Sequence, residues 1–178
     1  MHTAINACLM RYLAIALLVF VGGCSGKSAD FCRLLTMDEV RKLHPGVVTA
    51  KMEEWYKSTD HPTWFCTWRD GNGKGLLSLS VSFTTSNSSK DLLTTYSGGS
   101  RVAEVPGVGN DAAALFYRDR EDSTERFTMF ARDDKWILDI RSPIVGDENG
   151  EQFQIVKELA NRTFDSLATD KVFSKLKK

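Results

Sequence analysis

Strict alternation of apolar and polar residues over positions 77–83 constrains the fold of this chain more than any other feature. The alternating residues are Leu77, Ser78, Leu79, Ser80, Val81, Ser82 and Phe83. A period of two places one set of side chains on each face of a β-strand, so the pattern predicts one buried face and one hydrated face. An antiparallel sheet with one face in the core is therefore expected.

Weaker patterns divide the rest of the chain. Thr36 and Glu39 have the spacing of a capping box at a helix that ends before Pro45-Gly46. We further expect strands at 47–52, 63–69, 112–118, 125–132 and 135–141, and helices beginning at 88 and spanning 148–167. The apolar face of the last helix is predicted from three- and four-residue steps to be Phe153, Val156, Ala160, Thr163, Phe164 and Leu167.

These elements predict the fold class α+β. We expect an antiparallel sheet of five to six strands with helices on one face, in a single domain over 31–170, followed by a basic C-terminal tail over 171–178. The tripeptide Leu-Leu-Thr followed by Pro-Gly-Val occurs twice, at 34–36 with 45–47 and at 92–94 with 106–108. This repetition suggests a duplicated α-β-β-β unit.

The first 23 residues have the character of an export signal. They contain Arg11 and no acidic residue, and residues 13–21 are nine apolar residues in a row. That run is shorter than the roughly 20 residues of a membrane-spanning helix and fits the apolar core of a signal peptide. Residues 1–9 carry no Lys or Arg, so translation from Met10 instead of Met1 is a second hypothesis.

Val21-Gly22-Gly23-Cys24 resembles the lipobox of bacterial lipoproteins, in which the cysteine is acylated and becomes the new N-terminus. The resemblance implies a signal peptide over 1–23, lipidation of Cys24 and a lipidated short tether over 24–30. The plainer alternative is a secretory signal with an incidental cysteine. By the same resemblance, Ser25 permits transfer to an outer membrane facing the periplasm if the cell is Gram-negative.

The remaining cysteines predict a disulfide. With Cys8 removed and Cys24 acylated, Cys32 and Cys66 are left as an even pair in an oxidising compartment. Two cysteines do not make a structural zinc site without further ligands, and His44 and His61 lack ligand spacing. We expect a structural Cys32–Cys66 bridge and no metal.

Four short motifs resemble a group of small bacterial lipoproteins of unknown function, found notably in actinobacteria. The motifs are residues 31–36 with Glu39-Val40, Cys66-Thr67-Trp68, the segment 105–112, and Leu159-Ala160 near the C-terminus. The resemblance implies a lipid-anchored α+β domain with the Cys32–Cys66 bridge and brings no catalytic residues. The chain departs from the group at Asn110-Asp111, where Asp is expected directly after the glycine.

Charge and motif content narrow the function. The 23 Lys+Arg residues balance the 23 Asp+Glu residues, which counts against nucleic-acid binding. No Cys-x-x-Cys or Gly-x-Ser-x-Gly motif occurs, so neither enzymatic activity nor a cofactor is expected. The mixed-charge run 118–126 is predicted to be a solvated hairpin tip, with partner binding as the alternative. The lysines of the tail are predicted to complement the dipole at the frayed end of the last helix; the alternative is that they contact anionic lipid headgroups.

An aromatic-rich segment supplies the candidate binding residues. Trp64 and Trp68 share one face of a strand and are predicted to lie in the core, whereas Trp55, Tyr56 and His61 fall in an expected loop. The sequence favours an envelope lipoprotein, anchored to a membrane and acting as a non-enzymatic protein-interaction module with another envelope protein. The alternative is a small-ligand-binding lipoprotein with an aromatic cleft near Trp55, Tyr56 and His61.

Overall fold

The computed structural model describes residues 30–54, 63–83, 88–96, 100, 102–118, 123, 125–143 and 149–176. The described elements are, in chain order, η1 (Phe31–Leu34), α2 (Met37–Leu43), β1 (Thr49–Glu54), β2 (Thr63–Arg69), β3 (Gly75–Phe83), α3 (Ser89–Tyr96), β4 (Val102–Glu104), β5 (Asp111–Arg118), β6 (Glu125–Asp133), β7 (Trp136–Pro143), α4 (Glu151–Thr169) and η2 (Phe173–Lys175).

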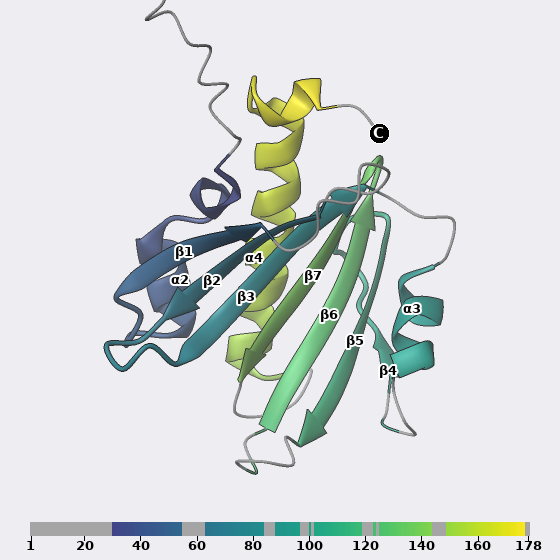
Figure 1. The fold of residues 1–178 in the computed structure, drawn as a ribbon. Helices are drawn as coiled ribbons and strands as arrows, with labels where there is room; N and C mark the ends of the chain where they lie inside the picture. Colours follow the sequence, from purple (N-terminus) through teal and green to yellow (C-terminus); the bar gives the residue numbers. More distant parts are fainter. Residues whose placement is uncertain are drawn as a thin grey trace, which may run out of the picture.

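The strands form one antiparallel sheet in the order β1-β2-β3-β7-β6-β5-β4 (Figure 1). The α+β class with an antiparallel sheet is confirmed, but the sheet has seven strands and the predicted number of five to six is wrong. The missed strand is β4, whose three residues are too few to show an alternating pattern.

The alternation of β3 has the predicted outcome. Leu77, Leu79, Val81 and Phe83 are at most 5% exposed, whereas Ser78, Ser80 and Ser82 are half-buried on the other side of the strand. Residues two apart share a face of a strand, so the serines lie on the side of the sheet that faces away from the main core.

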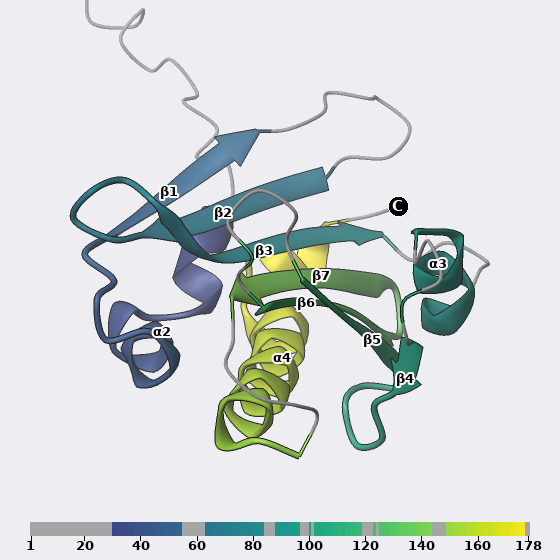
Figure 2. The same ribbon diagram turned by 90° about the horizontal axis from the view of Figure 1, so that it is seen from below.

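The predicted apolar face of α4 packs onto the core side of the sheet, as do residues of α2 (Figure 2). The capping box at the start of α2 is present, with Thr36 and Glu39 bonded to each other in both directions. The Oε1 atom of Glu39 also lies 2.7 Å from Nη1 of Arg162, which joins α2 to α4.

The prediction that all helices gather on one face is wrong for α3. Leu93 of α3 packs with Ala113 and Leu115 of β5, whereas Ala112 and Ala114 of the same strand belong to the core on the α4 side. The physical reason is that residues 112–115 are buried on both faces of the strand, so β5 needs cover from both sides.

The order α2-β1-β2-β3 is followed by α3-β4-β5-β6, and then by β7 and α4. β7 pairs with β3 of the first set and with β6 of the second. This order matches what a duplicated α-β-β-β unit would give, and the duplication itself stays a prediction.

The two ends of the described chain meet at one end of the sheet. The predicted Cys32–Cys66 disulfide is present, with a Cα–Cα distance of 5.3 Å, and ties η1 to β2. Phe31 stacks on Trp64 with ring centroids 4.4 Å apart and contacts Phe173 of η2 at 4.6 Å. Phe173 is 1% exposed, so this side chain anchors η2 to the core of the domain.

Candidate functional site

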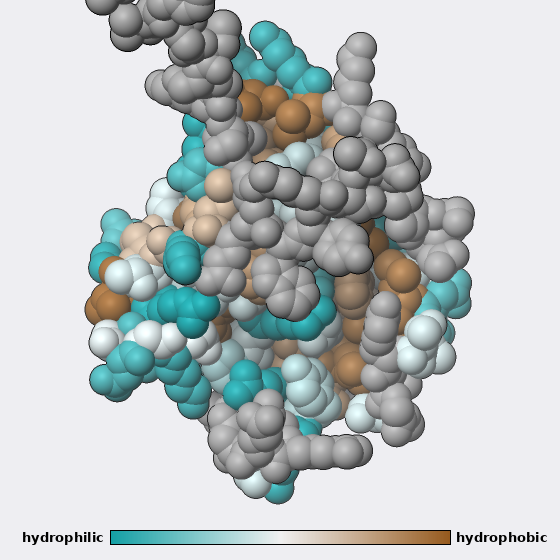
Figure 3. Space-filling view, in the orientation of Figure 1, coloured by the Kyte–Doolittle hydropathy of each residue, from teal (hydrophilic) through white to brown (hydrophobic). Residues whose placement is uncertain are grey.

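One half of the sheet carries polar side chains on the face opposite α4. In Figure 3, which shows this face, hydrophilic residues lie near the centre of the sheet and hydrophobic ones lie toward α3. Among the described helices, α3 packs against β4, β5 and β6 on this side, whereas the helix in contact with β7 is α4, on the opposite side. We call the outer faces of β3 and β7 the open face; on it Ile137 is buried, Ser78, Ser80, Ser82 and Asp139 are half-buried, and Arg141 is exposed.

An ion pair lies at the centre of the open face. Asp139 and Arg141 are two residues apart on β7 and therefore project from the same side of the strand. The Nη2 atom of Arg141 lies 2.6 Å from Oδ2 of Asp139, and Nε lies 3.1 Å from both carboxylate oxygens. The cross-strand neighbours are Ser80 and Phe130 for Asp139, and Ser78 and Thr128 for Arg141.

The two charges of this pair differ in their exposure to water. The Asp139 side chain is 12% exposed and the Arg141 side chain is 58% exposed. Burial raises the pKa of Asp139, and the hydrogen bonds and positive charge of Arg141 offset this only in part. The arrangement holds a guanidinium in place on an accessible surface, at the expense of a partly desolvated carboxylate.

Such a pair can donate hydrogen bonds to a polar group placed on this surface. A fixed guanidinium donates hydrogen bonds in a planar fork that suits carboxylates and main-chain carbonyls of a partner. The serine hydroxyls beside it accept and donate hydrogen bonds. The open face thus offers directional polar contacts around one charged centre.

A histidine–serine contact lies in the interior. Nε2 of His44 is hydrogen-bonded to Oγ of Ser142, and this hydroxyl lies 3.1 Å from the carbonyl oxygens of Leu76 and Pro143. Burial lowers the pKa of His44. Ser142 is 3% exposed, so the hydroxyl is out of reach of a substrate and the contact is structural.

A shallow groove of about 490 Å³ runs along residues 104–112 beside the start of α3. The charged side chains that line it are bonded within the protein: Lys90 pairs with Glu104 at 2.8 Å, and Asp111 accepts the main-chain N–H of Ser89 at 2.7 Å. The groove therefore presents charges that are already matched to one another.

The structure places some of the sequence-predicted residues and not others. Trp68 is fully buried, and Trp64 is half-buried within an aromatic cluster at the core, as predicted. Trp55, Tyr56, His61 and the lipidation residue Cys24 lie outside the described residues, and so does most of the hairpin tip after Arg118.

Within the ranges listed above, no group of three His, Cys, Asp or Glu residues has the geometry to hold a metal ion. None of the described helices is long and apolar enough to span a membrane.

Asp139 and Arg141 were not singled out in the sequence. Their signal is an acidic residue in the middle of a strand whose core positions, Trp136, Leu138 and Ile140, place it on the opposite face. Asp is disfavoured in strands, so its presence at the centre of one points to a local role.

The fold and this site define an α+β domain with an antiparallel sheet and a polar, half-covered face. Comparisons with protein-family models, curated proteins and solved structures found no match for the chain.

Proposed function

We propose that this chain is a lipid-anchored lipoprotein of the bacterial envelope whose domain binds another envelope protein through the open face. The anchor rests on the lipobox-like residues 21–24 behind a short apolar run. The binding role rests on one observation, the half-exposed Arg141 held by a nearly buried Asp139. No catalytic step is assigned to the domain.

Energetics support a binding role for the pair. An ion pair with one desolvated member contributes little to stability, because burial costs about as much as the pairing returns. A residue that strains the fold is often retained for function. Arginine is also enriched among the residues that dominate binding energy at protein interfaces.

Photo-crosslinking in cells tests the binding role. A photoreactive phenylalanine analogue in place of Ser78, directly across from Arg141, is expected to form a discrete adduct with one envelope protein. The same analogue in place of Asp165, an exposed residue on α4, is the matched control and should not form that adduct. Adducts of the same pattern at both positions would contradict the proposal.

A pair of arginine variants separates the open face from the hairpin tip. Arg141→Gln should abolish the adduct at Ser78. Arg118→Gln changes another exposed arginine, paired with Glu125 at 3.4 Å, and should leave the adduct intact. Loss of the adduct in Arg118→Gln alone would transfer the interface to the hairpin tip.

The anchor has its own test. Mass spectrometry of the N-terminal peptide is expected to show an acylated Cys24 as the first residue, with loss of labelled palmitate in Cys24→Ser. An unmodified Cys24 behind a cleaved signal would support the plain secretory alternative. Attachment of two or more acyl chains to Cys24 would make release from the membrane negligible, because each buried CH₂ contributes about 0.8 kcal/mol.

A further inference from the structure

We infer that the end of the domain formed by η1, η2 and the β6–β7 turn rests on an anionic phospholipid surface. This inference builds on the proposed lipid anchor and adds an orientation to it.

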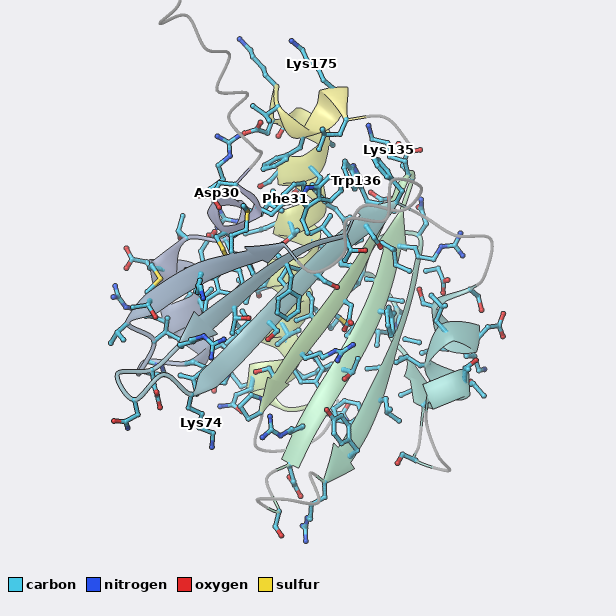
Figure 4. All side chains as sticks on the ribbon, viewed as in Figure 1. Asp30, Phe31, Lys74, Lys135, Trp136 and Lys175 are labelled. Atoms are coloured by element: carbon cyan, nitrogen blue, oxygen red, sulfur yellow. A yellow bond between two sulfur atoms is a disulfide. The ribbon has the colours of Figure 1, made fainter. Side chains whose placement is uncertain are left out.

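The start of the domain and its basic C-terminal residues lie side by side. Figure 4 shows Asp30, Phe31, Lys135 and Lys175 at one end of the molecule and Lys74 at the other. Contacts confirm this arrangement, since Nη2 of Arg33 lies 3.0 Å from Oδ1 of Asp170 and its guanidinium lies 4.9 Å from the ring centre of Phe173.

The short tether brings this end to the membrane. Residues 25–30 span at most about 20 Å when fully extended. A lipid on Cys24 would therefore hold Asp30 within that distance of the bilayer. The opposite end, with Lys74 in the β2–β3 turn, would lie a full strand length further away (Figure 4).

The attachment is stiff enough to fix an orientation. The Cys32–Cys66 disulfide joins η1 to β2, and Phe31 is 1% exposed between Trp64 and Phe173. The domain therefore has no hinge between Phe31 and its sheet, and the same end faces the lipid whenever the tether is short.

The surface of this end suits anionic headgroups. Lys171 and Lys175 are exposed and, in the part of the chain that the structure describes, take part in no ion pair. Val172, which lies between them in the sequence, is 42% exposed and is one of two exposed large hydrophobic residues among those described. Cations next to an exposed apolar side chain are typical of surfaces that lie in the headgroup region.

Two of the acidic groups at this end are bonded within the protein. Asp170 pairs with Arg33, and Asp30 accepts the main-chain N–H of Cys32 at 3.0 Å. Asp134, in the β6–β7 turn, follows the half-buried Asp133 and precedes Lys135, whose ammonium donates to the carbonyl of Leu176 at 2.7 Å. The lysine side chains are longer than these carboxylates and reach further outward, and Lys177 and Lys178 follow in the sequence.

Reconstitution of the mature, membrane-extracted protein tests the orientation. Energy transfer from its tryptophans to a dansyl headgroup lipid is measured in vesicles rich in phosphatidylglycerol and in vesicles of phosphatidylcholine alone. Transfer should be higher in the anionic vesicles. It should fall to the phosphatidylcholine level at high salt, because salt screens the attraction between the lysines and the anionic headgroups.

Matched variants identify the residues. Each lysine near an anionic surface is worth about fivefold in surface affinity, so K171Q/K175Q should lower the affinity of this end for the surface by about twenty-five-fold and remove the extra transfer. K74Q, at the far end, should behave as wild type. Equal transfer in the two vesicle types, or the same loss in K74Q, would overturn the inference.

Flotation separates this inference from the anchor. A lipidated protein floats with phosphatidylcholine vesicles whatever its charge. If the protein carried no lipid, flotation with anionic vesicles alone would still support contact between the basic end and the lipid surface. Flotation with neither kind of vesicle would overturn the inference.

Discussion

The carboxylate of Asp139 lies beneath the guanidinium of Arg141 on the outer face of β7, with Oδ2 and Nη2 2.6 Å apart. The acid is nearly buried while the base is mostly exposed. Stability alone does not favour this arrangement, because an apolar side chain at the centre of a sheet would be more stable than a nearly buried carboxylate.

Asp139→Asn should stabilise the fold at neutral pH. The pKa of Asp139 is raised by burial, so the folded chain holds its proton more tightly than the unfolded chain. Stability therefore falls as pH rises from about 3.9 through the pKa in the fold. The amide removes that loss and should raise Tm by about 2 to 4 °C for each kcal/mol gained.

Thermal unfolding of wild type and Asp139→Asn across this pH range measures the effect. The difference should be largest at neutral pH and vanish in acid. A lower Tm for the variant at neutral pH would show that the ion pair stabilises the fold.

His44 should make the fold sensitive to mild acid. Burial lowers the pKa of His44 from 6.5, so the folded chain binds its proton less readily than the unfolded chain. The stability contributed by the neutral His44 is complete above about pH 6.5 and is lost as pH falls toward the pKa of His44 in the folded chain. Urea unfolding at several pH values should show this slope in wild type and a flatter one in His44→Gln. Equal slopes would contradict the assignment.

Gly109 should not tolerate a side chain. Its φ is +52°, and a Cβ there would overlap the main-chain oxygen of Arg132 and lie 3.0 Å from Cε2 of Phe164. The turn is also held by Asn161, which donates to the carbonyl of Gly107 at 2.8 Å. Gly109→Ala should cost more than about 2 kcal/mol.

Gly107→Ala is the matched control for this turn. Gly107 also has a positive φ, +79°, but a Cβ there meets nothing within 4 Å. Only backbone strain remains, about 1–2 kcal/mol. Similar losses for the two variants in chemical denaturation would show that packing against Arg132 and Phe164 is unimportant.

Loss of the disulfide should weaken the fold. Cys32 and Cys66 are 34 residues apart, and closing a loop of this size is worth about 4 kcal/mol in the chain-entropy model. Cys32→Ala with Cys66→Ala should lower the midpoint of urea unfolding, and a reducing agent should lower it in wild type only. An effect of the reductant on the double variant would point to another cause.

The sequence predicted the parts of the fold that have a clear period. The alternation over 77–83 and the apolar spacing of α4 both mark buried faces, and the structure confirms them. β4 was missed because three residues carry no period. The side of the sheet occupied by α3 was missed because periodicity reports which residues are buried and not which layer covers them.

The candidate site was harder to predict. The sequence predicted a strand over 135–141 but did not mark Asp139 or Arg141 as special, because charged residues are ordinary on the hydrated face of a sheet. Their importance depends on burial by neighbouring strands, which only the register reveals. Trp55, Tyr56 and His61 lie outside the described residues and remain predictions.

The most direct test of the binding face is crosslinking at Ser78 in the Asp139→Asn variant. This variant should be at least as stable as wild type but should lose most of the adduct, because Arg141 no longer has the charge that fixes it. A stable Asp139→Asn protein that forms the adduct at the wild-type level would contradict the assignment of the open face as the binding surface.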